Sequence, residues 1–248
     1  MTETGAAKRR VCLVTGGTSG IGRAFVDALH RRGDDVRFCA RSPDAVAAVE
    51  AALPGSTGYV CDVTDDVALA AMTDLIAIDA GRLDLLVANA GRLVEMNFNA
   101  APLDPALIEA DIALNLVSPI LTINRCLPLL LRGEHSAIVL TGSGFGWSPT
   151  ARAPLYSGAK AGVRMFAKAL GAQLAPAGVT VTELVPPPVD TPAVAHRNVA
   201  KLSPEHVVAA TLRGVERGRR AVFPGHARFL PLGLRLVPQL IERMTLKS

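Results

Sequence analysis

The chain has 248 residues, of which 50% are hydrophobic and 19% are charged, and its formal net charge is +4. This composition excludes a disordered chain and provides enough apolar residues for a substantial core. Because no Gly/Ser-rich or Pro-rich linker divides the sequence, we expect one domain over residues 1–248.

Short apolar runs alternate with longer helical patterns along the chain. The predicted strands are residues 11–15, 36–40, 58–63, 83–90, 136–143 and 179–185. The predicted helices are residues 21–32, 43–53, 65–81, 105–131 and 154–175. Strands that are apolar on both faces are typical of a parallel, doubly wound α/β sheet, which places a ligand crevice at the carboxyl ends of its strands.

Residues at the ends of the predicted helices and strands agree with this division. Asp65 is expected to cap the third helix, Gly33 and Gly81 follow predicted helix ends, and Gly178 precedes the sixth strand. The apolar stretch 114–131 is predicted to be a buried helix and not a membrane span, because polar residues and prolines interrupt it. These interruptions are Asn115, Pro119, Asn124, Arg125 and Pro128.

Several classes of protein are disfavoured by what the sequence lacks. The first residues carry no signal-peptide pattern, so we expect a cytoplasmic protein with a flexible start over about residues 1–8. The four cysteines lack CxxC spacing and the five histidines lack HExxH spacing, so we expect buried thiols and no metal site. The basic cluster 213–220 has no interleaved aromatic residues, which favours a solvated helix end over a nucleic-acid surface.

A glycine-rich turn, TGGTSGIG at residues 15–22, follows the first strand and opens the first helix. Glycines there let the backbone approach a pyrophosphate, which the free N–H groups of the helix N-terminus then favour. The alternative is a tight turn with no ligand.

This turn resembles the TGxxxGxG turn of the short-chain dehydrogenase/reductase family, and the similarity covers nearly the entire chain. Asp62 follows the third strand, where the family aspartate binds the adenine amino group, and Asn89-Ala90-Gly91 resembles the family's NAG motif. The alternatives are a helix-start residue for Asp62 and a turn former for Asn89. The resemblance implies a single-domain Rossmann-type sheet of about seven strands with helices on both faces. The cofactor contacts that it implies in this half are Gly16, Thr18, Ser19, Gly20, Ile21, Gly22, Asp62, Val63, Asn89, Ala90 and Gly91.

The end of the second strand decides the expected cofactor. NAD-binding folds place a carboxylate there to bind the ribose 2′-hydroxyl, whereas this chain has Ala40 followed by Arg41. Because a guanidinium suits a 2′-phosphate, we expect NADP(H) in preference to NAD(H). The alternative is that Arg41 is a solvated strand end.

Tyr156 and Lys160 lie one turn apart on the helix that begins near Pro154, so both project from one face. A nearby ammonium favours phenolate, which makes tyrosine an effective proton donor and acceptor near neutral pH. The alternative is an amphipathic helix with an exposed lysine. Ser143 follows the fifth strand at the crevice rim, where its hydroxyl is placed to hold a substrate oxygen, unless it is only part of a flexible turn.

In the family that the chain resembles, the corresponding residues are the catalytic Ser, Tyr and Lys. The same resemblance matches Asn115 to the asparagine that maintains a water relay to the lysine, and it assigns Tyr156 and Lys160 to the cofactor as well. A buried asparagine in an apolar helix needs partners in any case.

The segment after the sixth strand departs from the family. Pro186, Val189 and Thr191 fit the family's contacts to the nicotinamide carboxamide, but Pro187 replaces a glycine. Three consecutive prolines remove backbone donors and stiffen this segment, so we expect an unusual loop path or substrate access.

Substrate selectivity is expected from the variable segments around the crevice. Phe145 and Trp147 are candidates to contact an apolar or aromatic substrate beside Ser143 and Tyr156, with core or interface packing as the alternative. The segment about 190–204 is expected to be a substrate-side loop. The apolar tail, about 226–248, is expected to cover the pocket or join subunits, with a membrane surface as a third option.

The leading hypothesis is therefore an NADP(H)-dependent oxidoreductase of the ketoreductase type, which transfers hydride between the nicotinamide and a carbonyl or secondary alcohol, with Tyr156 as general acid/base. Two alternatives remain: an epimerase or double-bond enzyme, and a nucleotide-binding regulatory or scaffold protein. The family resemblance also implies a homodimer or homotetramer formed through the helices at 105–131 and 154–175.

Overall fold

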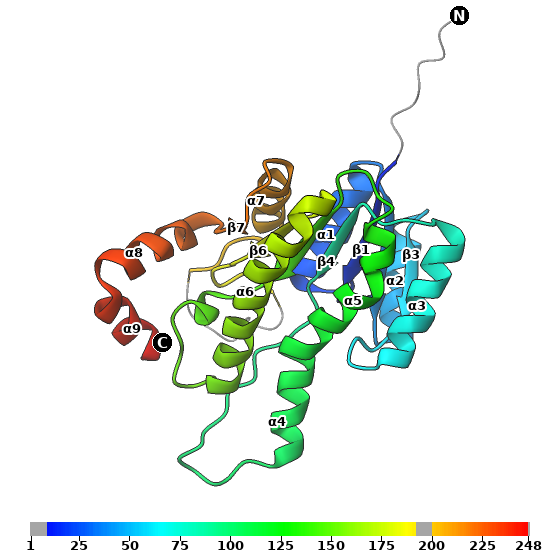
Figure 1. Cartoon of the computed structure of the whole chain (residues 1–248). Coiled ribbons are helices and arrows are strands. Elements are labelled where there is room, and N and C mark those ends of the chain that lie inside the picture. The colour runs from blue at the N-terminus through cyan, green and yellow to red at the C-terminus, as the bar shows by residue number, and fades with distance from the viewer. Residues whose placement is uncertain (1–8, 192–199, 248) are drawn as a thin grey trace, which may run out of the picture.

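The computed structural model describes residues 9–191 and 200–247 of the chain. Seven strands form one parallel sheet in the order β3-β2-β1-β4-β5-β6-β7 (Figure 1). The strands are β1 (Val11–Thr15), β2 (Asp35–Ala40), β3 (Thr57–Val60), β4 (Leu85–Ala88), β5 (Ala137–Thr141), β6 (Thr180–Leu184) and β7 (Ala221–Val222). The predicted doubly wound α/β fold is confirmed.

Helices cover both faces of the sheet. They are α1 (Gly20–Arg31), α2 (Pro43–Ala52), α3 (Asp66–Asp79), α4 (Pro105–Ile112), α5 (Ser118–Leu130), α6 (Pro154–Leu174), α7 (Pro204–Glu216), α8 (Leu230–Leu236) and α9 (Pro238–Leu246). Two apolar cores follow from the alternation of side chains along β1. Leu13 packs with α3, α5 and α6, whereas Cys12 and Val14 pack with α1, α2 and α7. The side chains of all four cysteines are buried thiols.

Helix caps lie where the sequence places them. The Asp65 carboxylate accepts hydrogen bonds from the backbone N–H groups of Val67 and Ala68, and so caps α3. Gly33 and Gly81 follow helices with φ of 81° and 69°, in the left-handed region that glycine favours.

The predicted helix at 105–131 contains an irregular turn. A five-residue π-turn, Ala113–Val117, joins α4 to α5 and carries Asn115. The continuous helix Pro105–Leu130 is long and apolar enough to cross a membrane by length and composition alone. One face of this helix packs on the sheet and on α3 and α6, and 33% of its apolar window is buried.

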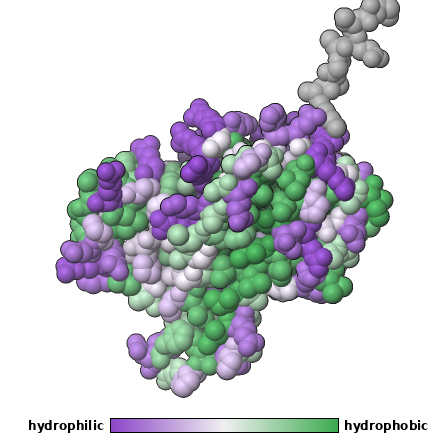
Figure 2. Space-filling model, viewed as in Figure 1, coloured by the Kyte–Doolittle hydropathy of each residue, from purple (hydrophilic) through white to green (hydrophobic). Residues whose placement is uncertain are grey.

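Apolar residues also remain on the outer surface of these helices. Figure 2 shows an apolar area over α4, α5 and α6. The large hydrophobic side chains exposed on these helices and at their connections are Leu107, Val117, Leu131 and Met165. An exposed apolar surface of this kind commonly marks a protein interface.

The C-terminal part differs most from the prediction. Helix α7 was not predicted as a separate helix, and the two-residue β7 was not located. Helices α8 and α9 bury none of their residues. The tail nevertheless touches the segment that follows β5, where Ser148 Oγ and Thr245 Oγ1 lie 2.7 Å apart. The predicted flexible start at 1–8 and most of the predicted loop at 190–204 lie outside the described residues.

Candidate active site

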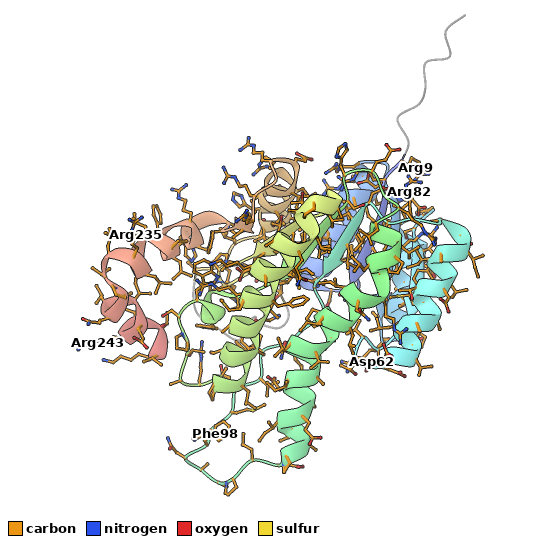
Figure 3. The ribbon with its side chains drawn as sticks, in the orientation of Figure 1. Arg9, Asp62, Arg82, Phe98, Arg235 and Arg243 are labelled. Carbon is orange, nitrogen blue, oxygen red and sulfur yellow. The ribbon has the colours of Figure 1, made fainter. Side chains whose placement is uncertain are left out.

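A cavity of about 600 Å³ lies at the carboxyl ends of strands β1 to β6. Figure 3 shows Asp62 at this end of the sheet and Arg9 and Arg82 at the opposite end. The cavity size is that of a typical small-molecule or cofactor site. The sequence-predicted residues that line it are Gly16, Thr18, Ser19, Gly20, Ile21, Arg41, Asp62, Val63, Asn89, Ala90, Gly91, Ser143, Phe145, Tyr156, Lys160, Pro186, Val189 and Thr191.

The glycine-rich turn forms the floor of one end of this cavity. Gly16 has a φ of 66°, which favours glycine. A β-carbon on Gly22 would lie 2.1 Å from Gly16 O, so the turn and α1 can approach only without a side chain there. The Ser19 side chain makes no hydrogen bond that caps α1, so the residue at this helix start leaves the first N–H groups uncapped. The turn therefore fits a pyrophosphate, whereas Gly22 shapes the turn and does not line the cavity.

Asn89 ties together the ends of three strands. The backbone N–H groups of Asn89 and Ala90 both donate to Thr15 Oγ1 at 3.0 Å. Asn89 Nδ2 donates to Thr15 O, and Thr141 Oγ1 donates to Asn89 Oδ1. The predicted NAG segment thus holds β1, β4 and β5 in register at the cavity.

Arg41 and Asp62 lie side by side at the end of the cavity formed by β2 and β3. Arg41 Nη1 is 4.0 Å from Asp62 Oδ2, and the arginine side chain is 68% exposed. Partial burial opposes ionisation of Asp62, but two hydrogen bonds from Thr64 and the charge of Arg41 lower the pKa of its carboxyl. Asp62 therefore stays ionised. The amide and hydroxyl groups that donate to its carboxylate belong to Thr64.

Tyr156 and Lys160 lie on α6 and face the cavity together. Lys160 is only 3% exposed, its ammonium donates to Thr141 O at 2.9 Å, and Nζ is 5.7 Å from the centre of the Tyr156 ring. Burial lowers the pKa of Lys160 to about 8, although the carboxylates of Asp111 and Glu183 oppose this shift. A phenol beside a buried ammonium is suited to proton transfer near neutral pH.

Asn115 lies behind the cavity and does not line it. Its side-chain amide donates to Arg92 O and Asp111 Oδ1 and accepts from Arg92 N. A β-carbon on Gly91 would lie 3.0 Å from Asn115 Oδ1 and 3.4 Å from Lys160 Nζ, so these groups converge under Gly91. The π-turn directs Asn115 there, and π-turns occur frequently at functional sites.

Ser143 lines the same cavity as Tyr156 and is the second residue of the segment 142–147. Its side chain is largely buried, and its Oγ accepts from Phe145 N at 3.1 Å, which fixes the short turn that follows. Phe145 lines the cavity.

The structure corrects the predicted position of Trp147. Trp147 is not among the residues that line the cavity; its Nε1 donates to Glu183 Oε1, and its ring forms a T-shaped pair with Phe223. Trp147 therefore packs within the protein, because Glu183 on β6 offers a buried acceptor for its N–H.

The proline segment after β6 forms part of the cavity wall. Pro186, Pro187 and Pro188 line it together with Val189 and Thr191. The segment is held by Leu202, whose N–H donates to Pro188 O and whose carbonyl accepts from Asp190 N. The prolines thus leave an open cavity with Val189 and Thr191 on its wall.

Two acidic residues beside the site were not predicted. Asp111 and Glu183 are both buried and both interact electrostatically with Lys160. The sequence offered two signals for them. Glu183 is a charged residue inside the apolar run 179–185, and Asp111 lies one helical turn before Asn115. Among residues 9–191 and 200–247, no three His, Cys, Asp or Glu side chains are grouped so as to hold a metal ion.

Comparisons with known proteins match this architecture. A family profile described as short chain dehydrogenase matches residues 10–201. The chain is 36% identical over 189 residues to the monensin polyketide synthase putative ketoacyl reductase of Streptomyces virginiae. The aligned region covers 74% of this chain and 72% of that protein. It is 32% identical over 185 residues to the 2-dehydro-3-deoxy-L-rhamnonate dehydrogenase (NAD(+)) of Sphingomonas sp. (strain SKA58), covering 74% and 73%.

A solved structure gives the same picture in three dimensions. The crystal structure of a single-substitution variant of actinorhodin polyketide ketoreductase with NADPH superposes with a TM-score of 0.78 at 27% sequence identity. The superposition covers 86% of this chain and 94% of that one.

Proposed function

Because this chain belongs to the short-chain dehydrogenase family, we propose that it is an NADP(H)-dependent ketoreductase with Tyr156 as its general acid/base. One observation carries the proposal. Tyr156 and the buried ammonium of Lys160 line the same cavity as the glycine-rich turn, with Nζ 5.7 Å from the Tyr156 ring centre.

In the proposed reaction, a ketone, NADPH and one proton give a secondary alcohol and NADP⁺. NADPH, when bound, would supply the hydride that the carbonyl carbon accepts. Tyr156 donates its phenolic proton to the carbonyl oxygen, and in the reverse direction the phenolate accepts the proton of the alcohol. The Ser143 hydroxyl donates a hydrogen bond to the same oxygen and holds the carbonyl in place. Lys160 favours the phenolate electrostatically.

The NADP(H) preference rests on Arg41 and Ala40. No carboxylate stands at the end of β2 to repel a 2′-phosphate, and the exposed Arg41 side chain borders the cavity. The similarity to a ketoreductase crystallised with NADPH supports this choice. A second relative is named for NAD(+), so NADPH and NADH binding must be compared directly.

The substrate is proposed to be a small carbonyl compound with an apolar or aromatic body. Leu93, Leu114 and Phe145 provide apolar surface on the cavity wall near Tyr156. The ketoacyl and polyketide reductase names of two similar proteins support a carbonyl substrate.

We further propose a homodimer or homotetramer formed through α4, α5 and α6. The exposed apolar side chains on these helices support this assembly. Light scattering of the purified protein measures its oligomeric state, and a monomer at all concentrations would contradict the proposal.

The central experiment compares wild type, Tyr156→Phe and Tyr59→Phe on a panel of ketones, with NADPH consumption as the readout. Tyr59 is the only other tyrosine, lies on β3, and hydrogen-bonds Arg37 away from the cavity. We expect wild type and Tyr59→Phe to reduce at least one ketone, and Tyr156→Phe to be slower by at least about 100-fold with unchanged NADPH affinity.

Two outcomes would contradict this assignment. Equal turnover by wild type and Tyr156→Phe would show that Tyr156 is not the acid/base. Tight NADPH binding without turnover of any ketone by wild type would favour a nucleotide-binding regulatory or scaffold protein.

A further inference from the structure

Glu183 is a buried carboxylate beside the site, and the proposed reaction gives it no role. It lies on β6, between β5 and β7, and is only 4% exposed. Burial raises the pKa of its carboxyl, although Trp147, Arg164 and Lys160 oppose the shift. A buried carboxylate is strongly unfavourable without such partners, so its contacts indicate what it does.

The first partner of Glu183 is the indole of Trp147. Trp147 Nε1 donates to Glu183 Oε1 at 3.1 Å. The guanidinium carbon of Arg164 lies 3.5 Å from the centre of the Trp147 ring, and Phe223 meets the ring edge-on at 5.0 Å. The indole therefore has a guanidinium over its ring, an aromatic neighbour at a near-right angle and an acceptor for its N–H, and the positive charge of Arg164 acts on the carboxylate.

The same carboxylate also lies against the backbone immediately before Ser143. A β-carbon on Gly142 would come 2.5 Å from Glu183 Oε1. Glu183 thus touches both ends of the segment 142–147, at Gly142 and at Trp147. Between these ends, Gly146 packs on the main chain of Lys160, where a β-carbon would lie 2.7 Å from Lys160 O. The segment that presents Ser143 is fixed between Glu183 and α6.

Glu183 also contributes charge to the surroundings of Lys160. The charged groups that act on the ammonium come from two elements, Asp111 on α4 and Glu183 on β6, and both are carboxylates. From α6 itself, Tyr156 faces Lys160, and Arg164 lies one turn further along, over Trp147. Because Lys160 is buried, two carboxylates stabilise its ammonium against loss of its proton.

We propose that Glu183 is a positioning residue of the reductase site: its carboxylate fixes the segment that carries Ser143 through Trp147 and Gly142, and its negative charge stabilises the Lys160 ammonium beside Tyr156. This inference rests on the proposed function. It goes beyond that function by adding a buried acidic group that acts through Ser143 and Lys160 without touching substrate.

The first test needs no turnover, because Trp147 is the only tryptophan of the chain. Protonation of Glu183 weakens the hydrogen bond from the indole, so tryptophan emission should change with pH. We expect wild type and the control Glu50→Gln to show this transition above the ordinary pH range of a glutamate. Glu50 lies on α2 and bonds Gly58 N, away from the cavity. In Glu183→Gln the transition should be absent, and identical titrations in wild type and Glu183→Gln would overturn the proposal.

The second test measures the pH profile of ketone reduction, which a purely structural glutamate would not shift. Removing a negative charge favours the first loss of a proton from the Tyr156 and Lys160 pair. In Glu183→Gln the alkaline limb of kcat should therefore move to lower pH by roughly one unit, at the lower end of shifts from a close opposite charge. Glu50→Gln should keep the wild-type profile.

A third variant separates the hydrogen bond from the charge. Trp147→Phe keeps an aromatic ring and the Glu183 charge but removes the N–H donor. We expect its alkaline limb to stay in place and its kcat to fall by about 10-fold, as misplacement of Ser143 requires, with unchanged KM for NADPH. This variant tests the fixing of the segment even if Glu183→Gln does not fold.

The outcomes distinguish this inference from the proposed function. If wild type reduces no ketone but the emission transition depends on Glu183, the proposed function fails and the contact stands. If wild type is active and a folded Glu183→Gln keeps its kcat and its pH profile, the inference is wrong and the proposed function stands. If Trp147→Phe kept the wild-type kcat, the proposal that Glu183 fixes the segment carrying Ser143 through Trp147 would also be wrong.

Discussion

Replacement of Arg41 by alanine tests the expected cofactor preference most directly. The arginine side chain is 68% exposed, and its charged neighbour is Asp62, with Nη1 and Oδ2 4.0 Å apart. A hydrogen bond to a charged group contributes about 1.5–3 kcal/mol, and an exposed ion pair contributes less. Because Arg41 is exposed and is shared with Asp62, we take about 1–2 kcal/mol for its contact with a 2′-phosphate.

This free energy corresponds to a loss of about 5–30-fold in NADPH affinity. NADH carries no 2′-phosphate, so its affinity should be unchanged in Arg41→Ala. Titration calorimetry with each nucleotide measures both affinities. The matched control is Arg23→Ala, because Arg23 pairs with Asp27 along α1 and does not line the cavity. Equal weakening of NADPH and NADH binding, or no change in either, would refute the assignment of Arg41 to the 2′-phosphate.

Two further predictions concern the turn and the lysine. In Gly22→Ala the added methyl group would lie 2.1 Å from Gly16 O. Because this overpacks a close contact, NADPH binding should be lost and the melting temperature should fall by several degrees. A nucleotide titration and a calorimetric scan measure the two effects, and full NADPH affinity would contradict the steric argument. Burial lowers the pKa of Lys160 to about 8, so the ammonium is lost as the pH rises through that value. The rate of ketone reduction by wild type should therefore decline above that pH. In Lys160→Met the remaining activity should lack this alkaline decline, and an unchanged decline would show that another group titrates.

The glycine-rich end of the cavity was largely predictable because it depends on local sequence. The glycine-rich turn, the missing carboxylate at Ala40 and the position of Asp62 each follow from a strand end and the residues next to it. The central strands were also predictable, since burial on both faces leaves an almost continuous apolar run.

The chemical half depended more on contacts between distant segments. The direction of Trp147 is set by Glu183, which lies on a different strand, so neither sequence neighbourhood alone indicates the contact. The π-turn around Asn115 has no distinctive residue pattern, and the two-residue strand β7 is too short to show a period. Pro187 suggested an altered loop path, but only the bridge to Leu202 shows how the segment is held against the cavity.

The two halves of the cavity are joined by Asn89, and this connection explains why distant motifs act as one site. Its backbone and side chain bind Thr15 at the start of the glycine-rich turn, while Thr141 donates to its side-chain oxygen from β5. The carbonyl of Thr141 in turn accepts from the Lys160 ammonium. A hydrogen-bonded path therefore runs from the glycine-rich turn to the lysine beside Tyr156. Because this path crosses β1, β4 and β5, where the order of the strands reverses, the sheet itself fixes the separation between the glycine-rich turn and Lys160.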